Sequence, residues 1–412
     1  MCWRAGVLAV CSMIGIGLVG CADDLDLLNV EEASVSAGEP SDFSAKEPPE
    51  KYVDHMGHIW VRSHQIEYVD DDDEELVWDF DEDMIDPDPE PDPTTSTDQE
   101  YGEYFRPISD IGGWEFHLAD ESVESYGAFL RERAVARLKG PEHDLSLFEG
   151  IGSEVGIGEK SARELPRTFR ASIITAARII GADERTVINH LAHLHPWVLH
   201  GHMDCTAFKA VNHYSAVTAA HCVHNGKSWK TRHDIQFSAG SKWISGQVVP
   251  AAVPSGCYTR TVPGRYVAGA NLPKNDYAVI AFRGHGAWCP TESWNFGYFG
   301  WKSVPIGSKF ASHMSGYPLD EPLPFPSWQK PTLVYSYKGS QSIYTSVFQP
   351  NVVKFTHDTT GGQSGTPLIS YDSTSGYQAR AILKGHGPAT NRNWGREFNG
   401  GVADFVWLRG GY

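Results

Sequence analysis

Residues 359–367 of this chain read TTGGQSGTP, a glycine-rich turn built around one serine. The glycines at positions 361, 362 and 365 allow the backbone to turn tightly on both sides of Ser364. In such a turn the amide groups of Gly362 and Ser364 can converge on a developing oxyanion. The alternative is a turn with an inert serine, which predicts neither the second glycine nor matching segments upstream.

Two upstream segments supply the groups that a serine nucleophile needs. Residues 218–222 read TAAHC and contain His221, and residues 275–280 read NDYAVI and contain Asp276. A serine hydroxyl is a weak nucleophile unless an imidazole accepts its proton, and a carboxylate in turn orients the imidazole. A core histidine and a turn aspartate are the alternatives. Because a carboxylate before a buried strand is costly unless it is paired, we expect His221, Asp276 and Ser364 to form a catalytic triad.

Residues 179–412 have the pattern of an all-β domain. Short runs rich in valine, isoleucine, tyrosine and phenylalanine alternate with turns rich in glycine, proline, asparagine and serine. These runs include residues 277–282, 332–337, 352–355 and 379–383. They do not alternate with helices as parallel sheets require, so the pattern predicts antiparallel strands in a barrel or a pair of barrels.

The same region resembles the chymotrypsin-fold serine proteases, and in particular the bacterial glutamyl endopeptidases. The chain order His, Asp, Ser is that of the chymotrypsin arrangement. Further matching segments, in collinear order, are IGADERT (180–186), CTAF (205–208), VPSG (253–256), GYFG (297–300), SGYP (315–318) and the run 358–367. The resemblance implies two antiparallel β-barrels with the triad at their seam. It also implies an endopeptidase that hydrolyses polypeptides through an acyl-enzyme, without a cofactor.

The specificity pocket departs from this resemblance. Glutamyl endopeptidases have a pocket histidine on the strand after the nucleophile, and ungapped threading places Leu383 there. His386 could take the role only if the strand bulges or shifts. Thr359 matches a pocket threonine of the family, whereas Lys384 is less suited because adjacent strand residues point to opposite faces. A preference for glutamate, with Thr359 and His386 binding the substrate, is therefore one expectation among others.

Maturation is expected to differ from that of trypsin. In trypsin-like zymogens a new isoleucine amine pairs with an aspartate just before the nucleophilic serine. Gln363 stands at that position here, so the ion pair cannot form. The mature domain of the family begins near residues 177–180, which predicts a zymogen activated by removal of a covering segment.

The first residues have the features of an export signal. Arg4 precedes an apolar stretch of 15 residues, 5–19, which is shorter than the roughly 20 residues of a membrane span. Residues 18–21 read LVGC and resemble a bacterial lipobox, so Cys21 is the expected lipidation site. An ordinary cleaved signal is the alternative. We expect an exported bacterial protein, anchored to the membrane or cell surface by lipid and secreted after processing.

The cysteine count agrees with export. Of seven cysteines, Cys2 and Cys11 would leave with the signal and Cys21 would carry the lipid. The four that remain predict two disulfides, as is typical of an oxidising compartment. They are Cys205, Cys222, Cys257 and Cys289. Cys205 and Cys222 suit a bridge between the strand before His221 and the turn that carries it, and the cysteine spacing predicts no metal site.

The front of the chain differs in charge from the rest. Residues 22–104 contain 28 acidic and 3 basic residues, whereas residues 105–412 carry a net charge of +6. Acidic, proline-rich sequence extends and lacks a core, which favours a solvated tether over a calcium site. Nothing in the charge pattern indicates binding to nucleic acid. The expected division is a lipoprotein signal peptide (1–20), a disordered acidic tether (21–104), a helical propeptide or pro-module (105–178) and a serine protease domain (179–412).

These features together predict a lipid-anchored, exported serine endopeptidase made as a precursor. Two other functions would use the same segments. An esterase-like hydrolase would share the triad but leave polypeptides intact. A surface binding or adhesion protein on a protease fold would be catalytically silent.

Overall fold

The computed structural model describes the larger part of residues 47–410. The described ranges are 47–69, 90–139, 185–187, 197–199, 205–212, 214–231, 234–244, 247–253, 257–268, 273–282, 298–318, 334–345, 351–386 and 392–410. The signal peptide, Cys21 and the expected processing site near residue 179 lie outside these ranges. None of the helices in the described ranges has the length and hydropathy needed to span a bilayer.

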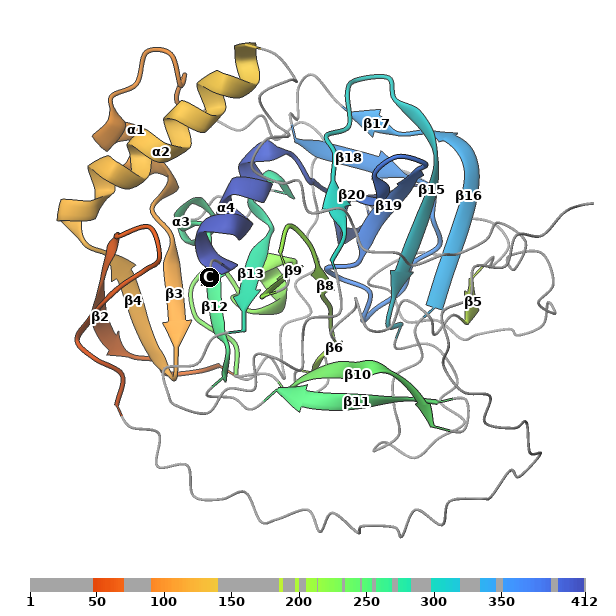
Figure 1. Ribbon diagram of the computed structural model, residues 1–412, viewed down its shortest axis with the longest axis horizontal. Coiled ribbons are helices and arrows are strands. Elements are labelled where there is room, and N and C mark those ends of the chain that lie inside the picture. Colours follow the sequence, from red (N-terminus) through yellow and green to blue (C-terminus); the bar gives the residue numbers. More distant parts are fainter. Residues whose placement is uncertain are drawn as a thin grey trace, which may run out of the picture. The chain divides into compact units, whose positions relative to one another are not determined.

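Three sheets dominate the structure, and the prediction of an all-β antiparallel domain is confirmed (Figure 1). Within them, only the pair β14–β20 is parallel. The first sheet has eight strands in the order β1 (Lys51–Val53), β2 (Ile59–Gln65), β4 (Trp114–Leu118), β3 (Ile108–Ile111), β12 (Thr259–Val262), β13 (Ala278–Ala281), β9 (Ser215–Thr218) and β8 (Phe208–Lys209).

The other two sheets contain only strands that follow residue 185. A four-stranded sheet has the order β11 (Gln247–Val253), β10 (Asp234–Ile244), β6 (Trp197–Leu199) and β7 (Cys205–Thr206). The largest sheet has the order β17 (Tyr344–Thr345), β18 (Val352–Phe355), β21 (Asn393–Glu397), β20 (Gly376–His386), β19 (Pro367–Asp372), β15 (Lys309–Gly316), β16 (Val334–Ser342) and β5 (Thr186–Val187), with β14 (Gly300–Trp301) paired to β20. Short helical turns, α3 (Gly264–Val267) and η6 (Pro273–Asn275), precede β13.

The front of the chain is not an extended tether where the structure describes it. Residues 47–139, which we call the front module, contain β1 to β4 and the helices α1 (Asp98–Phe105) and α2 (Asp120–Lys139). The prediction of disorder is thus wrong for 47–69 and 90–104, while 70–89 lie outside the described ranges. The helical segment expected over residues 105–178 contains helix α2 but also strands β3 and β4, and residues 140–178 lie outside the described ranges.

Apolar residues within and after the acidic segment explain why it folds where disorder is expected. Their buried core includes Trp60, Tyr101, Phe116, Val123 and Tyr126. Helix α1 begins at a capping box, in which the Thr97 hydroxyl accepts from the amide of Glu100. These aromatic and aliphatic side chains bury enough surface to fold the segment despite its charge.

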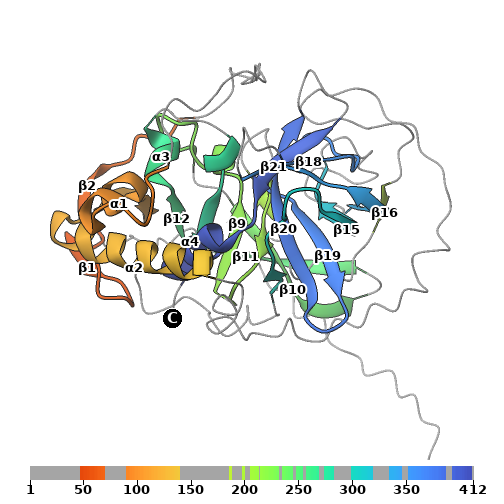
Figure 2. The ribbon, with the colours of Figure 1, turned by 90° about the horizontal axis from the view of Figure 1, so that it is seen from above.

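Helices α1 and α2 of the front module pack closely against each other. A Cβ at Gly127 would lie 1.7 Å from the carbonyl oxygen of Asp98, and one at Gly102 would lie 2.2 Å from that of Val123. Glycine is therefore required where the two helices cross. Figure 2 shows α2 beside the last helix, α4 (Gly400–Gly410), which lies against β13 and β9.

Candidate active site

His221 and Asp276 meet at one end of the first sheet. Strands β9 and β13 are antiparallel neighbours with Thr218 opposite Ala278. His221 follows β9 on the one-turn helix η4 (Ala220–Cys222), and Asp276 stands two residues before β13, so both leave the same end of the sheet. Asp276 accepts from the His221 Nδ1 at 2.8 Å and from its backbone amide at 2.9 Å. One carboxylate thereby fixes both the ring and its backbone.

Asp276 is fully buried and held in its ionised form. Burial alone would raise its pKa, but the charges of His221 and Lys384 and the two hydrogen bonds from His221 outweigh this effect. The pKa of Asp276 consequently lies well below its usual range. The Lys384 Nζ is 3.2 Å from Asp276 Oδ2, and both side chains are almost completely shielded from solvent.

Ser364 lies on the turn that leads into β19. Gly362 and Gly365 on this turn have φ of +84° and +85°. A Cβ at Gly365 would lie 2.1 Å from the Thr206 carbonyl oxygen, which only glycine tolerates. Thr206 of β7 also donates its amide to the Ser364 carbonyl at 2.8 Å and its hydroxyl to that of Gly362 at 3.1 Å. Strand β7 therefore holds the Ser364 turn in position.

Two amides of this turn are available to an incoming anion. Gln363 N–H donates to the Thr360 carbonyl and Gly365 N–H to that of Leu383. Within the described residues, the amides of Gly362 and Ser364 donate to no acceptor. These are the two donors that the sequence predicts for an oxyanion hole.

Among the described contacts, the Ser364 hydroxyl is hydrogen-bonded to Lys384 and not to His221. It donates to the carbonyl oxygen of Lys384 at 3.2 Å. Catalytic hydrogen bonds of this kind are often long or misaligned before substrate binds. The structure thus brings together His221 and Asp276, and it connects Ser364 to them through Lys384.

Lys384 is the member of the site that the sequence reasoning missed. The pairing of β20 with β21 shifts register between Leu383 and Gly385, so Lys384 is the extra residue of a β-bulge. Its side chain contacts Asp276, its carbonyl accepts from Ser364, and its ammonium lies 5.6 Å from the Trp394 ring. A lysine within the apolar run AILKGH was the available signal, because a buried ammonium needs a partner.

The candidate specificity residues have different surroundings. Leu383 is buried in a core cluster that includes Met314, Phe355 and Leu368. Thr359 is also buried, and its hydroxyl oxygen has no hydrogen-bond partner among the described residues. The bulge at Lys384 is the kind of irregularity that His386 would require. The backbone of His386 lies opposite Asn393, but its side chain is not described.

The Gln363 side chain stabilises the loop on which it lies. Its side-chain Oε1 accepts from the amide of Thr360 at 2.9 Å, and the side chain is nearly inaccessible. Arg185, just before β5, donates to the Thr360 hydroxyl at 2.9 Å. A neutral amide thus occupies the place where trypsin-like zymogens have an aspartate.

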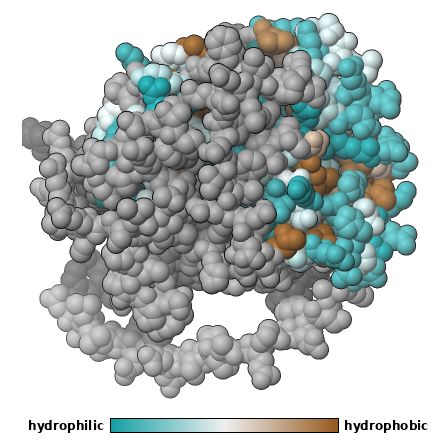
Figure 3. Space-filling model, turned by 180° about the vertical axis from the view of Figure 1, so that it is seen from behind, coloured by the Kyte–Doolittle hydropathy of each residue, from teal (hydrophilic) through white to brown (hydrophobic). Residues whose placement is uncertain are grey.

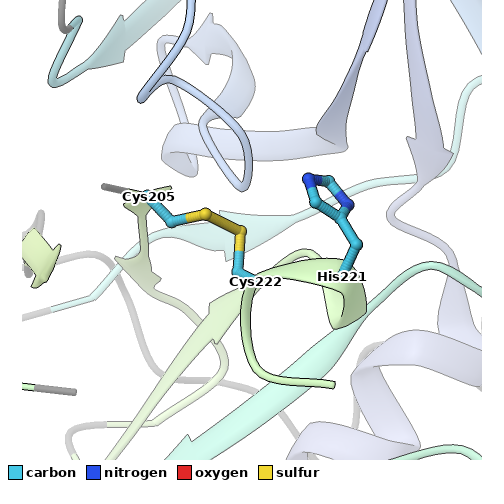
Figure 4. A group of neighbouring side chains, drawn as sticks. All are labelled: Cys205, His221 and Cys222. Atoms are coloured by element: carbon cyan, nitrogen blue, oxygen red, sulfur yellow. A yellow bond between two sulfur atoms is a disulfide. The ribbon is translucent and has the colours of Figure 1, made fainter. Parts of the chain in front are cut away.

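The predicted bridge between Cys205 and Cys222 is present (Figure 4). It ties β7, which seats the Ser364 turn, to the helical turn that carries His221. Cys257 is also disulfide-bonded, and Cys289 lies outside the described residues. The ligand atoms of Cys205, His221 and Cys222 lie within 4.8 Å of one another. Because both sulfurs are in a disulfide and His221 Nδ1 is bound to Asp276, this group suits the triad better than a metal ion.

Several solved structures are similar to this chain. A Glu endopeptidase in complex with MPD is 19% identical, with a TM-score of 0.43, over 55% of this chain and 97% of that one. The protease Anisep from Arthrobacter nicotinovorans is 16% identical, with a TM-score of 0.38, over 53% and 94%. The thermostable serine protease AL20 is 18% identical, with a TM-score of 0.39, over 53% and 97%.

These similar structures are serine proteases. No family model matches the chain, and no curated protein is significantly similar to it. With TM-scores below 0.5, the functional assignment depends on the geometry of the site itself.

Proposed function

We propose that the protein is a serine endopeptidase. The observation that carries the proposal is the contact between the buried Asp276 and the partly exposed His221, 2.8 Å apart, beside a turn on which Ser364 and two available amides lie. This combination supplies a base, the group that orients it, a nucleophile and donors for an oxyanion.

The proposed reaction begins with rotation of the Ser364 hydroxyl from the Lys384 carbonyl toward His221 Nε2. His221 accepts the proton as Ser364 Oγ attacks the peptide carbonyl, while the Asp276 carboxylate stabilises the imidazolium. The amides of Gly362 and Ser364 donate to the tetrahedral oxyanion. His221 then protonates the leaving amine, and water releases the acyl group with His221 again acting as base.

A fluorophosphonate probe tests the nucleophile. We expect it to label the processed protein and not the Ser364→Ala variant. Ser308→Ala is the matched control, since Ser308 lies on an exposed turn and should leave labelling unchanged. Absence of labelling in the unmodified protein, or equal labelling of Ser364→Ala, would contradict the catalytic role and favour a silent binding protein. Digestion of an unfolded polypeptide would distinguish an endopeptidase from an esterase-like hydrolase, because only the endopeptidase would cleave it.

We also propose a preference for glutamate, with His386 and Thr359 binding the substrate. The bulge at Lys384 supports this, because it changes the alternation of side chains before His386. His386→Ala should lower kcat/KM for a glutamyl peptide about 10-fold or more relative to its alanyl analogue, as for loss of a charged hydrogen bond. His64→Ala in the front module is the control. An unchanged Glu-to-Ala ratio would exclude His386 as the reader of the substrate carboxylate.

The proposal extends to location and maturation. We propose that the protein is exported, anchored to a membrane through a lipid on Cys21, cleaved near residue 179 and secreted once it is also cut free of the lipid. The leader-like residues 1–21 support the first two steps, and the Cys205–Cys222 disulfide is typical of an oxidising compartment. Polypeptides are the proposed substrates.

A further inference from the structure

We propose that the front module, residues 47–139, stays bound to the catalytic region after processing, so that the mature enzyme consists of two chains. The inference rests on the proposed function only for the cleavage near residue 179. The front module then acts as a structural subunit of the protease and is not the covering segment that activation removes.

Continuous strand pairing joins the two parts. Strand β3 of the front module pairs with β12 over four residue pairs, from Ile108–Val262 to Ile111–Thr259. The Ser109 hydroxyl lies 2.8 Å from that of Thr261 in the buried interior. Removal of the module would leave β12, the neighbour of the strand that follows Asp276, as an unpaired sheet edge.

A buried ion pair lies within this strand pairing. Arg260 of β12 donates to Asp110 of β3 from Nε at 2.9 Å and from Nη2 at 2.5 Å, and both side chains are fully inaccessible. Tyr68 also donates to Asp110, at 3.2 Å. The pair fixes the register of β3 on β12, because a shift of either strand would leave a buried charge away from its partner.

A second attachment involves the C-terminal helix. Asp404 of α4, whose side chain is 1% exposed, binds Arg133 at 3.2 Å and Arg137 of α2. Arg409 of α4 binds Asp54 of the front module at 3.2 Å. Each side thus supplies both a cation and an anion, so the contact is electrostatically complementary.

Apolar packing connects these charged contacts. Leu408 of α4 is buried in the same cluster as Trp60 and Tyr126, and the Arg409 guanidinium lies 4.2 Å from the centre of the Trp60 ring. On the face shown in Figure 3, the described surface is mostly hydrophilic with small apolar patches. The core of the module is thus shared with α4, as in permanent interfaces.

The front module leaves the catalytic residues uncovered where the structure describes it. No described residue of the module makes a hydrogen bond or ion pair with His221, Asp276 or Ser364. Its contacts include β12, the helices α3 and α4, and the loop of Trp229, whose indole donates to Glu115 at 2.7 Å. With the module in place 17% of the His221 side chain is exposed, so removal of the module is not needed to expose this ring.

The test uses the full chain in the Ser364→Ala background, with a recognition sequence for a site-specific protease inserted between residues 139 and 185. After cutting, we expect both fragments to co-elute in gel filtration at the mass of the uncut chain and to separate only in denaturant. Separation in native buffer would overturn the proposal. This experiment measures the mass of the complex, whereas the fluorophosphonate probe measures the reactivity of Ser364. Failure of the two-chain proposal can therefore be told apart from failure of the proposed catalytic function.

Two variants and a matched control make the test specific. Asp110→Ala should release the fragments in native buffer after cutting. Asp120→Ala, which removes an exposed partner of Arg106 within the module, should leave them associated. If Asp110→Ala does not fold before cutting, the pair Arg133→Gln and Arg137→Gln weakens the attachment to α4 and should increase dissociation with rising dilution. Equal retention in these variants and the control would show that the ion pairs of Asp110 and Asp404 are not what holds the module in place.

Discussion

Replacement of Asp276 by asparagine is expected to lower kcat for peptide hydrolysis by about 10⁴. Asparagine has nearly the same shape, but its amide can donate to His221 Nδ1. His221 would then carry its proton on Nε2, where the proton of Ser364 must be accepted. The charge that stabilises the imidazolium would also be lost. Single-turnover kinetics with a labelled peptide would measure the effect.

The control for this variant uses Lys384. Asp276→Asn leaves the Lys384 ammonium, 3.2 Å away, without its carboxylate in a buried site, so the loss of activity could include misfolding. The double variant Asp276→Asn with Lys384→Met removes the ammonium together with the carboxylate and should recover thermal stability without recovering activity. Lys384→Met alone keeps the triad carboxylate and should lose far less than 10⁴. A kcat for Asp276→Asn within tenfold of the parent would rule out Asp276 as the triad carboxylate.

The parts of the site that are local in sequence could be predicted. The turn around Ser364 is encoded by glycines that adopt positive φ at positions 362 and 365. The spacing of Cys205 and Cys222 suits the bridge that forms. His221 and Asp276 could be paired because each adjoins a short apolar strand, and neighbouring antiparallel strands bring such ends together.

Features that depend on distant pairing could not be predicted. The bulge at Lys384 arises from the register between β20 and β21, and adjacent residues in a regular strand would point to opposite faces. The contact between Lys384 and Asp276 joins two different sheets. No local pattern around either residue specifies it.

The front module was missed for a different reason. Average composition over residues 22–104 is dominated by acidic residues and proline, which predicts disorder. The segment contributes few apolar residues to a core, among them Trp60 and Tyr101. Their packing partners lie in α2 and, at the opposite end of the chain, in α4. Asp110 likewise finds Arg260 at a separation of 150 residues. Composition averaged over a segment carries no information about contacts between residues so far apart in the sequence.

Substitution of Asp110 by alanine should therefore lower the free energy of unfolding by about 3–5 kcal/mol, the cost of breaking a buried ion pair from one side. The Arg260 guanidinium would retain the carbonyl oxygens of Lys230 and Thr231 as acceptors but lose its only described carboxylate partner. Urea unfolding of the uncut chain in the Ser364→Ala background would measure the change.

Two comparisons show whether charge or packing causes the loss. Asp120→Ala removes a carboxylate that is 92% exposed, and the median exposed ion pair contributes about 0–1 kcal/mol, so this variant should unfold almost as the parent does. The double variant Asp110→Leu with Arg260→Met replaces both charges by apolar side chains and should recover most of the lost stability. If Asp110→Ala and Asp120→Ala shifted the urea midpoint equally, the ion pair between β3 and β12 would not be what joins the front module to the catalytic sheet.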